Sequence, residues 1–358
     1  MSGAWSPDPP TFGQSSKAVT SVSVDVPALA SVTRKMCLRR LDHMHAVVQG
    51  VRLALHECRD QFKGKRWDCT VPGAENAPDP ESGFTRYTMG VFPGVSPGSR
   101  EDAFLSAIVA AGVSHVVARG CRQGQFRGSC SWVVPDAMRL PPRARRGGSS
   151  DDVEYGYQFA KWFVNVGDGS RSRQRGESLA MNLHDNEAGR LAVYNLAHMD
   201  CKCHLLFGRC MLKICWQQLA DFHQVGNLLK HKYDTSSAMR LVRHNSSSSV
   251  AGATRWSRWR LEPVNERLTA PTVSDLVHVS ASPGYCERND AGGINGTVRR
   301  RCNVTSEGKE ACSVITCCDR GYDISQVTLE TQCGCKEQLK ENVKCKLCPW
   351  TVDQFACK

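Results

Sequence analysis

The chain has 358 residues, a formal net charge of +11 and 41% hydrophobic residues, which is ordinary for a globular protein. No uninterrupted apolar run approaches the roughly twenty residues of a membrane helix, so we expect a soluble chain without a membrane span. The length is sufficient for two domains, each with a sizeable core.

Cysteines are distributed unevenly along the chain. Of 19 in total, ten lie between Cys286 and Cys357, so the last 73 residues cannot form an ordinary hydrophobic core. Such a density indicates either a disulfide framework made in an oxidising compartment or a set of metal sites.

Three N-glycosylation sequons begin at Asn245, Asn295 and Asn303, and they have a meaning only in the secretory pathway. A signal peptide is not evident, because Asp25 and Pro27 interrupt the weakly apolar stretch near the N-terminus. We therefore interpret residues 1–36 as an atypical, disordered N-terminus.

Helical periodicity dominates the chain from residue 37 to residue 235. Apolar residues recur every three or four positions from Leu41 to Cys58, which predicts a helix that directs Cys58 inward, toward Cys69. A helix over 101–119 has little polar face and should be central. Further helices are predicted at about 152–166, 177–199 and 216–233. Together they predict a mainly α-helical N-terminal domain.

A projecting hairpin is predicted within this domain at 201–215, where four cysteines surround a short tip. Residues two apart on a strand share one face, so Cys201 and Cys203 can both reach a returning strand. Two disulfide rungs are possible, Cys203 with Cys210 and Cys201 with Cys215. Gly208 allows the tip to turn.

The remaining chain changes character. Residues 236–275 are rich in serine and arginine without any period, which indicates a basic linker. Residues 276–358 suggest a small cysteine-rich domain of short strands and loops. A second stapled hairpin is predicted at 333–348, with Lys336 to Lys344 at its tip.

Basic clusters at 143–146, 171–175, 255–260 and 299–301 favour anionic partners such as heparan-sulfate-type glycans. Solvated loops would explain each cluster equally well. No recognisable module for reading nucleic acid accompanies them, so we expect no nucleic-acid partner.

Two other classes of protein were weighed against a disulfide framework. The cysteines of 333–348 also have the spacing of a tetrahedral zinc site, and Cys201-Lys-Cys203-His204 resembles a ligand spacing, so an intracellular zinc-binding protein is the alternative. An enzyme is not expected: no serine elbow, phosphate-binding loop or zinc-protease motif accompanies His184, His198 and His204, although acidic Asp185 and Asp200 lie nearby. No cofactor is expected.

Several motifs, in order, resemble the Wnt family of secreted cysteine-rich signalling ligands over most of residues 37–358. They lie at 57–69, 101–112, 152–159, 181–190, 201–204 and 215–216, together with the spacing of the C-terminal cysteines. The resemblance implies that a thumb hairpin and a finger hairpin together grip the cysteine-rich domain of a Frizzled-type receptor, with a Wnt co-receptor as a further partner.

The resemblance also implies nine disulfides and leaves Cys37 without an obvious partner. A further family bridge is missing at both ends, since only one cysteine, Cys130, stands at its first site and Ser149 stands at its second. The implied pairs are Cys58–Cys69, Cys121–Cys130, Cys201–Cys215, Cys203–Cys210, Cys286–Cys318, Cys302–Cys312, Cys317–Cys357, Cys333–Cys348 and Cys335–Cys345.

Both receptor-binding tips depart from the family pattern. Arg209 stands where the family carries an acylated serine, and Phe207 replaces the other serine, so the tip has no hydroxyl to accept a lipid. The family's Trp-Cys-Cys in the finger is replaced. The altered thumb is His204, Leu205, Leu206, Phe207, Gly208 and Arg209, and the altered finger is Leu339, Lys340, Glu341, Asn342 and Val343.

The function predicted from the sequence is that of a secreted, extracellular or matrix-associated Wnt-like ligand in developmental signalling. A long acyl chain could contribute on the order of 10 kcal/mol of gross binding free energy, at ~0.8 kcal/mol per buried CH₂. The Leu-Leu-Phe tip could supply ~1.5–3 kcal/mol per residue before ordering costs. We therefore expect weak or altered receptor binding without acylation, with an inactive or decoy ligand as the alternative.

Overall fold

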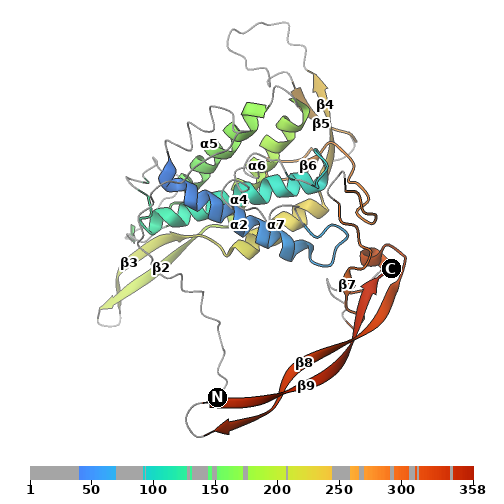
Figure 1. Cartoon of the computed structure of the whole chain (residues 1–358). Helices are drawn as coiled ribbons and strands as arrows, with labels where there is room; N and C mark the ends of the chain where they lie inside the picture. The colour runs from blue at the N-terminus through green and yellow to red at the C-terminus, as the bar shows by residue number, and fades with distance from the viewer. Residues whose placement is uncertain are drawn as a thin grey trace.

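The structure is a computed structural model that describes residues 40–69, 92, 94–126, 130, 144–146, 151–171, 176–206, 209–243, 259–265, 270–290, 294–305, 311–312, 314–338 and 342–358. A helical bundle carries a hairpin at one end, and a cysteine-rich domain at the other end carries a long curved ribbon (Figure 1). The principal helices are α2 (Leu41–Phe62), α4 (Arg100–Arg122), α5 (Val153–Arg171), α6 (Gly176–Leu196) and α7 (Phe222–Asp234).

Helix α4 is the centre of the bundle and contacts α2, α5, α6 and α7. Ser99 caps its N-terminus by accepting a hydrogen bond from the backbone N–H of Asp102, at 3.3 Å. Phe104, Leu105 and Ile108 are fully buried on it. The expected helix over 101–119 is therefore present and central.

One described helix, α4, is long and apolar enough to cross a membrane by length and composition. This corrects the expectation that no segment reaches that threshold. Most of its apolar stretch is buried inside the bundle, so the packing of four other helices accounts for its apolar character.

Two glycines allow α2 and α4 to cross at backbone contact. A Cβ added at Gly50 would lie 2.7 Å from the carbonyl oxygen of Gly112, and one added at Gly112 would overlap the carbonyl oxygen of Gly50. Neither obstacle is a flexible side chain, so any larger residue must force the helices apart.

We predict that Gly112→Ala lowers the free energy of unfolding by about 1–3 kcal/mol, because overpacking outweighs the gain in helix propensity. Chemical denaturation measures the change. Gly284→Ala is the control, since no atom beyond its chain neighbours lies within 4 Å of its added Cβ. Equal stability of the two variants would contradict the close-contact account.

A buried carboxyl group on α6 holds the start of the C-terminal part of the chain. Asp185 is fully buried, and its Oδ1 accepts a hydrogen bond from the backbone N–H of Val277, at 3.0 Å. Its Oδ2 has no hydrogen-bond partner among the described residues. Burial, and secondarily the negative charge of Asp102, raise the pKa of Asp185 well above its ordinary value.

Because the folded chain holds this proton more tightly than the unfolded chain does, the contribution of Asp185 is most favourable below the ordinary pKa of 3.8. It is lost as pH rises from there through the higher pKa of the folded state. We predict that Asp185→Asn weakens this decline and stabilises the protein at neutral pH. Unfolding free energies measured in parallel from acid to neutral pH test this, and a constant difference between the two proteins would contradict it.

The hairpin at the end of the bundle consists of β2 (His198–Leu206) and β3 (Arg209–Gln218), with β1 (Ala144–Arg146) parallel to β3. Here the predicted helix boundaries were wrong. Helix α6 ends at Leu196 because His198 to Asp200 pair with Trp216 to Gln218. That pairing also keeps 216–218 in a strand, so α7 starts only at Phe222, after the N-cap Asp221.

The segment expected to be a linker contains regular structure. Strands β4 (Ser237–Arg243) and β5 (Trp259–Pro263) pair antiparallel, and β4 also pairs parallel with the short β6 (Val277–His278). The interpretation of 236–275 as a linker without strands is corrected to this extent. The sequence of these strands has no clear alternation of polar and apolar residues, because most of the paired residues are only partly exposed to solvent.

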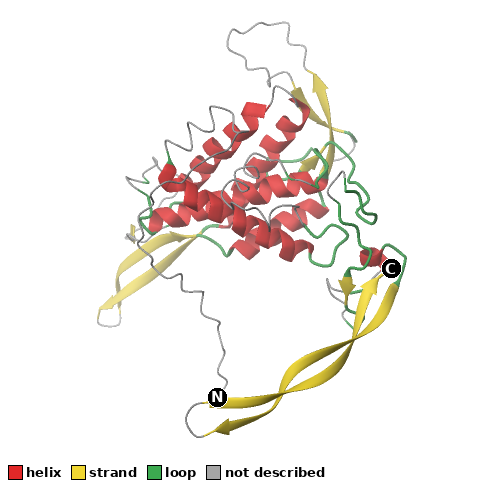
Figure 2. Ribbon diagram, in the orientation of Figure 1, coloured by secondary structure: helices red, strands yellow, loops and turns green. Residues whose placement is uncertain are grey.

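The C-terminal region contains short elements and one long ribbon (Figure 2). Strands β8 (Tyr322–Gln338) and β9 (Asn342–Cys357) pair antiparallel along the whole ribbon, and β7 (Arg301–Cys302) pairs with β9 at its base. The short helix α8 (Val314–Cys317) lies beside that base. A helical domain and a cysteine-rich domain with a hairpin confirm the predicted fold class.

Candidate functional site

Two disulfide rungs hold the β2–β3 hairpin, which we call the thumb. Cys201 lies opposite Cys215 in the strand register, and these two residues form one disulfide. A register shift between His204 and Leu205 brings Cys203 within reach of Cys210, and they form the other. These are the two rungs that the spacing of the cysteines makes possible.

The base of the thumb is fixed to the bundle by Asp151. Its backbone N–H donates to the carbonyl of Gln217 at 2.9 Å, and its carboxylate accepts from the backbone N–H of Leu219 at 3.0 Å. Cys215, in the outer rung, is fully buried. The thumb is therefore anchored at one end and projects at the other.

The described strands end at the predicted thumb tip. The backbone of β2 reaches Leu206 and that of β3 begins at Arg209, so residues 204–206 and 209 belong to the strands. Phe207 and Gly208 lie outside the described residues. Lower on the thumb, the exposed Lys202 places its ammonium nitrogen 5.7 Å from the ring centre of Trp216.

The β8–β9 ribbon, which we call the finger, also carries two disulfides, Cys333–Cys348 and Cys335–Cys345. A register shift between Cys333 and Lys336 accommodates them. The strands extend to Gln338 and from Asn342, while Leu339, Lys340 and Glu341 lie outside the described residues. The ribbon is longer than the predicted 333–348 hairpin because pairing continues back to Tyr322.

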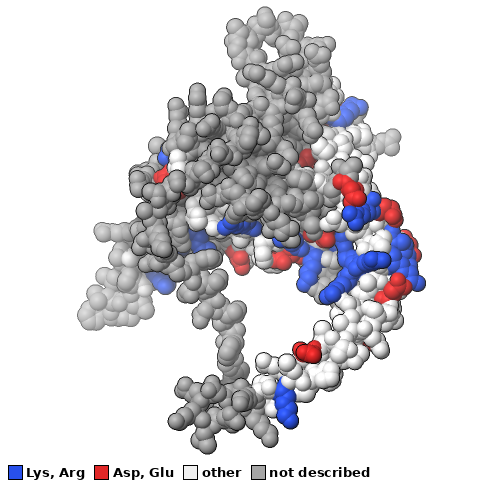
Figure 3. Space-filling model, viewed as in Figure 1, with Lys and Arg blue, Asp and Glu red and all other residues white. Residues whose placement is uncertain are grey.

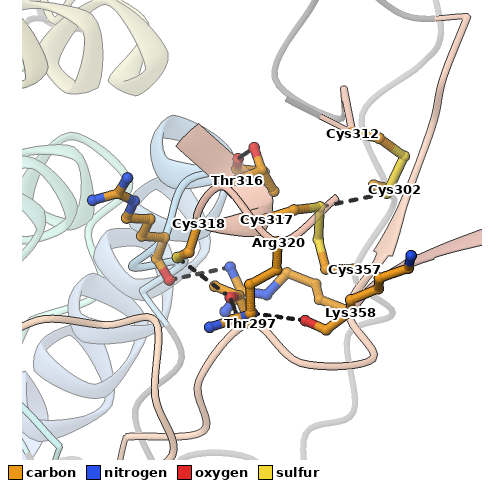
Figure 4. Close-up of a disulfide and its surroundings, with 12 residues drawn as sticks. Thr297, Cys302, Cys312, Thr316, Cys317, Cys318, Arg320, Cys357 and Lys358 are labelled. Atoms are coloured by element: carbon orange, nitrogen blue, oxygen red, sulfur yellow. Dashed lines mark hydrogen bonds between the residues drawn. A yellow bond between two sulfur atoms is a disulfide. The ribbon is translucent and has the colours of Figure 1, made fainter. Parts of the chain in front are cut away.

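Three more disulfides lie where the finger begins, and Figure 4 shows two of them, Cys302–Cys312 and Cys317–Cys357. The third is Cys286–Cys318. The Sγ atoms of Cys302 and Cys317 are 4.0 Å apart, a spacing that metal ligands also have. Each of these sulfurs is in a disulfide and is not a thiolate that could bind zinc. The same holds for the four cysteines of 333–348.

Arg320 joins the ends of this cystine cluster. Its guanidinium donates to the backbone carbonyl of Lys358 at 2.8 Å, to the hydroxyl of Thr297 at 2.5 Å and to the carboxylate of Glu287 at 2.6 Å. Thr297 is fully buried. Figure 4 shows Arg320 between Thr297 and Lys358. One side chain thus holds three segments of the domain.

Arg300 attaches this domain to the helical bundle. Its guanidinium donates to the carbonyls of Lys65 and Arg66, at 2.5 and 3.1 Å, and forms an ion pair with Asp68 at 3.2 Å. The hydroxyl of Thr316 donates to the carbonyl of Gly64 at 2.7 Å. All four acceptors lie in residues 63–68, which we call the docking turn, and the Cys58–Cys69 disulfide closes it.

We predict that Arg300→Ala lowers the free energy of unfolding by about 1.5–3 kcal/mol, because the carbonyls of Lys65 and Arg66 and the carboxylate of Asp68 lose a charged donor. The side chain of Arg300 is only 19% exposed, so solvent screens these contacts weakly. Arg288→Ala is the control, because that arginine is 73% exposed and pairs with the exposed Asp290. Equal melting temperatures for both variants would contradict the role of Arg300.

Sequence reasoning missed Arg300, Arg320 and Asp151. The basic cluster 299–301 predicts either an anionic partner or a solvated loop, and Arg299 and Arg301 are exposed as both interpretations require. The histidine considered for catalysis on α6, His184, donates instead from Nε2 to the carbonyl of Asp275 at 2.9 Å. Burial lowers its pKa. That histidine therefore connects α6 to the segment before β6.

The sequons occupy different environments. Asn303 and Thr305 are both exposed, whereas in the other described sequon Asn295 is exposed and Thr297 is buried. Asn245, Cys37 and residues 1–36 lie outside the described part of the chain. The remaining implied disulfide, Cys121–Cys130, is present, so the structure contains all nine pairs that the resemblance implies.

Two stapled hairpins on an anchored frame, with a cysteine-rich domain that depends on disulfides, define the class of disulfide-stabilised proteins that fold in oxidising compartments. Comparisons with known proteins identify the family. The model of the Wnt family matches residues 25–358. The chain is 41% identical to Wnt-5a of Mus musculus over 334 residues, which cover 92% of this chain and 80% of that protein. It is 42% identical to Wnt-5b of Xenopus laevis over 330 residues, 91% and 84% of the two chains.

A solved structure supports the same assignment. A chain in the structure of human WLS in complex with WNT8A aligns with 88% of this chain and 93% of its own length, with a TM-score of 0.55 and 28% identity. The chain belongs to the Wnt family, and it is a Wnt signalling ligand. The predicted resemblance is confirmed, and neither a zinc protein nor another of the alternatives is favoured.

Proposed function

We propose that this chain is a secreted Wnt ligand that contacts the cysteine-rich domain of a Frizzled-type receptor with its thumb and finger, without an acyl chain on the thumb. The observation that carries the proposal is the thumb itself. Its two rungs and its fixed base are in place, while the residue before Cys210, where the family carries the acylated serine, is Arg209.

Arginine lacks the hydroxyl oxygen that forms an ester, so the family's lipid cannot be attached at this position. The apolar residues Leu205, Leu206 and Phe207 are the candidates to replace it, at ~1.5–3 kcal/mol of burial each before ordering costs. That total lies below the ~10 kcal/mol that a long acyl chain could contribute. Receptor binding should therefore be weak but still sensitive to the thumb.

The finger supplies the second contact in this proposal. Residues 339–343 replace the family's aromatic and paired cysteines with Leu339-Lys340-Glu341-Asn342-Val343. The shaft below is held by two disulfides, so the tip is still presented at the end of a stapled ribbon. A polar tip of this composition favours a weak contact at the rim of the receptor interface. It does not favour a buried anchor at the centre of that interface.

Exposed basic residues support an additional interaction, with heparan-sulfate-type glycans. Figure 3 shows Lys and Arg gathered where the helical bundle meets the cysteine-rich domain. Lys63, Lys65, Arg299 and Arg301 are exposed in this region. Arg300 does not belong to that surface, because its guanidinium is occupied by the docking turn. A Wnt co-receptor is the further protein partner that the family implies.

Export to the extracellular space or matrix completes the proposal. Nine disulfides are characteristic of proteins that fold in an oxidising compartment. Relatives named as Wnt proteins match over more than nine-tenths of the chain. We infer a ligand that acts by binding in developmental signalling and not by catalysis.

The test combines lipid labelling with receptor binding. Cells that express the full chain are fed an alkyne fatty acid, and the purified protein is then titrated against a Frizzled cysteine-rich domain. We expect no label on the thumb and measurable weak binding. A double change, Leu205→Asp with Phe207→Asp, should weaken binding by about tenfold or more, since each buried anchor contributes at least ~1.4 kcal/mol.

Val273→Asp is the control, because Val273 is 62% exposed and lies far from both tips in the sequence. It should leave the affinity unchanged. A fatty acid ester on the thumb would contradict the absence of acylation. Undetectable binding by the unmodified chain, or equal binding by the double variant, would instead favour an inactive or decoy ligand.

A further inference from the structure

One face of the finger has four successive residue pairs without a charged side chain. Residues directly opposite each other in an antiparallel pair of strands lie on the same face, and that face recurs at every second residue. We call these four pairs the shaft strip. In order from the base of the finger they are Ser325–Gln354, Val327–Val352, Leu329–Trp350 and Thr331–Cys348.

The centre of the shaft strip is apolar and open to solvent. Trp350 is 65% exposed and Leu329, directly opposite, is 48% exposed. Val327 and Val352 beside them are half-buried. The ribbon that carries the strip projects away from the helical bundle (Figure 1). The centre of a protein interface is depleted of charged residues and enriched in aromatic ones, and the shaft strip has this composition.

The opposite face of the finger has no such centre. Its exposed apolar residues are Ile324 and Leu347, at 62% and 66% exposure. Leu347 lies opposite the polar Gln332, and the pairs between the two apolar residues include the charged Asp353 and Glu330. Single residues on this face are therefore as exposed as those of the shaft strip, but they do not form a continuous apolar surface.

The size of the shaft strip excludes a partner that binds it alone. A buried aromatic side chain covers about 150–250 Å², so the exposed parts of Trp350 and Leu329 offer on the order of 200 Å². A stable interface buries about 800 Å² on each partner. The strip therefore fits a protein that another part of this chain already holds.

A second copy of the chain fits this description poorly. Two strips stacked face to face would bury far less than a stable dimer needs. Edge-to-edge pairing of two fingers would require unbroken rows of backbone donors, and β9 contains Pro349, which has no N–H. Proline is one of the residues that prevent such pairing in natural edge strands.

We propose that the shaft strip is a further contact for the Frizzled-type receptor domain, with Trp350 as its aromatic anchor. The inference rests on the proposed function, in which the thumb and the finger already hold that domain. Residues 339–343 at the finger tip contain no aromatic residue, so Trp350 supplies the anchor from the same ribbon.

The disulfides of the finger hold the shaft strip ready for this contact. Cys348 belongs to the strip and is bonded to Cys333, and Cys335–Cys345 lies between the strip and the tip. Because these rungs fix the two strands before binding, little conformational entropy is lost when the receptor domain covers the strip.

The first test is a titration of the full chain and its variants against a Frizzled cysteine-rich domain. Trp350→Thr should weaken binding by about tenfold, which is about 1.4 kcal/mol. Leu347→Thr is the matched control, because Leu347 is equally exposed and lies three residues away on the opposite face. It should leave the affinity unchanged. Threonine is favoured in strands, so both variants keep the ribbon.

A second measurement needs no variant. The unmodified chain is oxidised by hydroxyl radicals with and without the receptor domain, and the modified tryptophans are quantified by mass spectrometry. Oxidation of Trp350 should fall severalfold in the complex. Trp162, which is 40% exposed on α5 and lies outside both hairpins, should be oxidised equally in both samples.

Each outcome separates this inference from the proposed function. Unchanged affinity of the Trp350→Thr variant together with unprotected Trp350 would overturn the shaft contact. The proposed function would stand in that case if the thumb double variant still bound more weakly. Absence of binding by the unmodified chain would overturn both. A dimer in sedimentation that Trp350→Thr abolishes would assign the strip to a second copy and would also overturn the receptor contact.

Discussion

The constraint on which this structure depends is the scarcity of core in its C-terminal third. Of the described residues after 280, the buried hydrophobic ones are Tyr285, Cys317 and Cys357, and two of these are cystine halves. Five disulfides therefore stabilise this region as apolar packing stabilises the helical bundle. Each contributes about 2–5 kcal/mol to the free energy of unfolding. A two-stranded ribbon as long as the finger is only marginally stable without such support.

The helical bundle and the cysteine-rich domain fix the bases of their hairpins in different ways. The thumb rises from a dense core, and its base is tied to the bundle by Asp151 and the buried Cys215. The finger rises from the cystine cluster, whose position is set by Arg300 on the docking turn. The disulfide Cys58–Cys69 closes that turn, so a single covalent loop connects the core of α2 to the base of the finger. The orientation of the two stapled hairpins follows from these few contacts.

Local sequence was sufficient to predict elements whose residue pattern lies within one short segment. The spacing of Cys201, Cys203, Cys210 and Cys215 made the two rungs possible, and the apolar face of residues 101–119 predicted the central helix. It was insufficient where partners are distant. Nothing near Arg300 distinguishes it from Arg299 and Arg301, because its acceptors in the docking turn lie more than 230 residues away. Likewise Trp216 to Gln218 have a helical pattern but form a strand, because tertiary pairing with His198 to Asp200 overrides it.

The site shows the same division. Family motifs predicted the thumb and the finger, and Arg209 before Cys210 predicts that the acyl acceptor is lost, because an ester requires a hydroxyl. The anchoring of the thumb base could not be foreseen, since Asp151 contacts Gln217 and Leu219 more than 60 positions later.

The most direct test of the account is to map the disulfides of the purified, unreduced protein by mass spectrometry, with free thiols blocked first. The account predicts the nine pairs described above, including Cys302–Cys312 and Cys317–Cys357 as separate bridges in spite of their proximity. Free thiols in 333–348 together with stoichiometric zinc, or an exchange of partners within the C-terminal cluster, would contradict it.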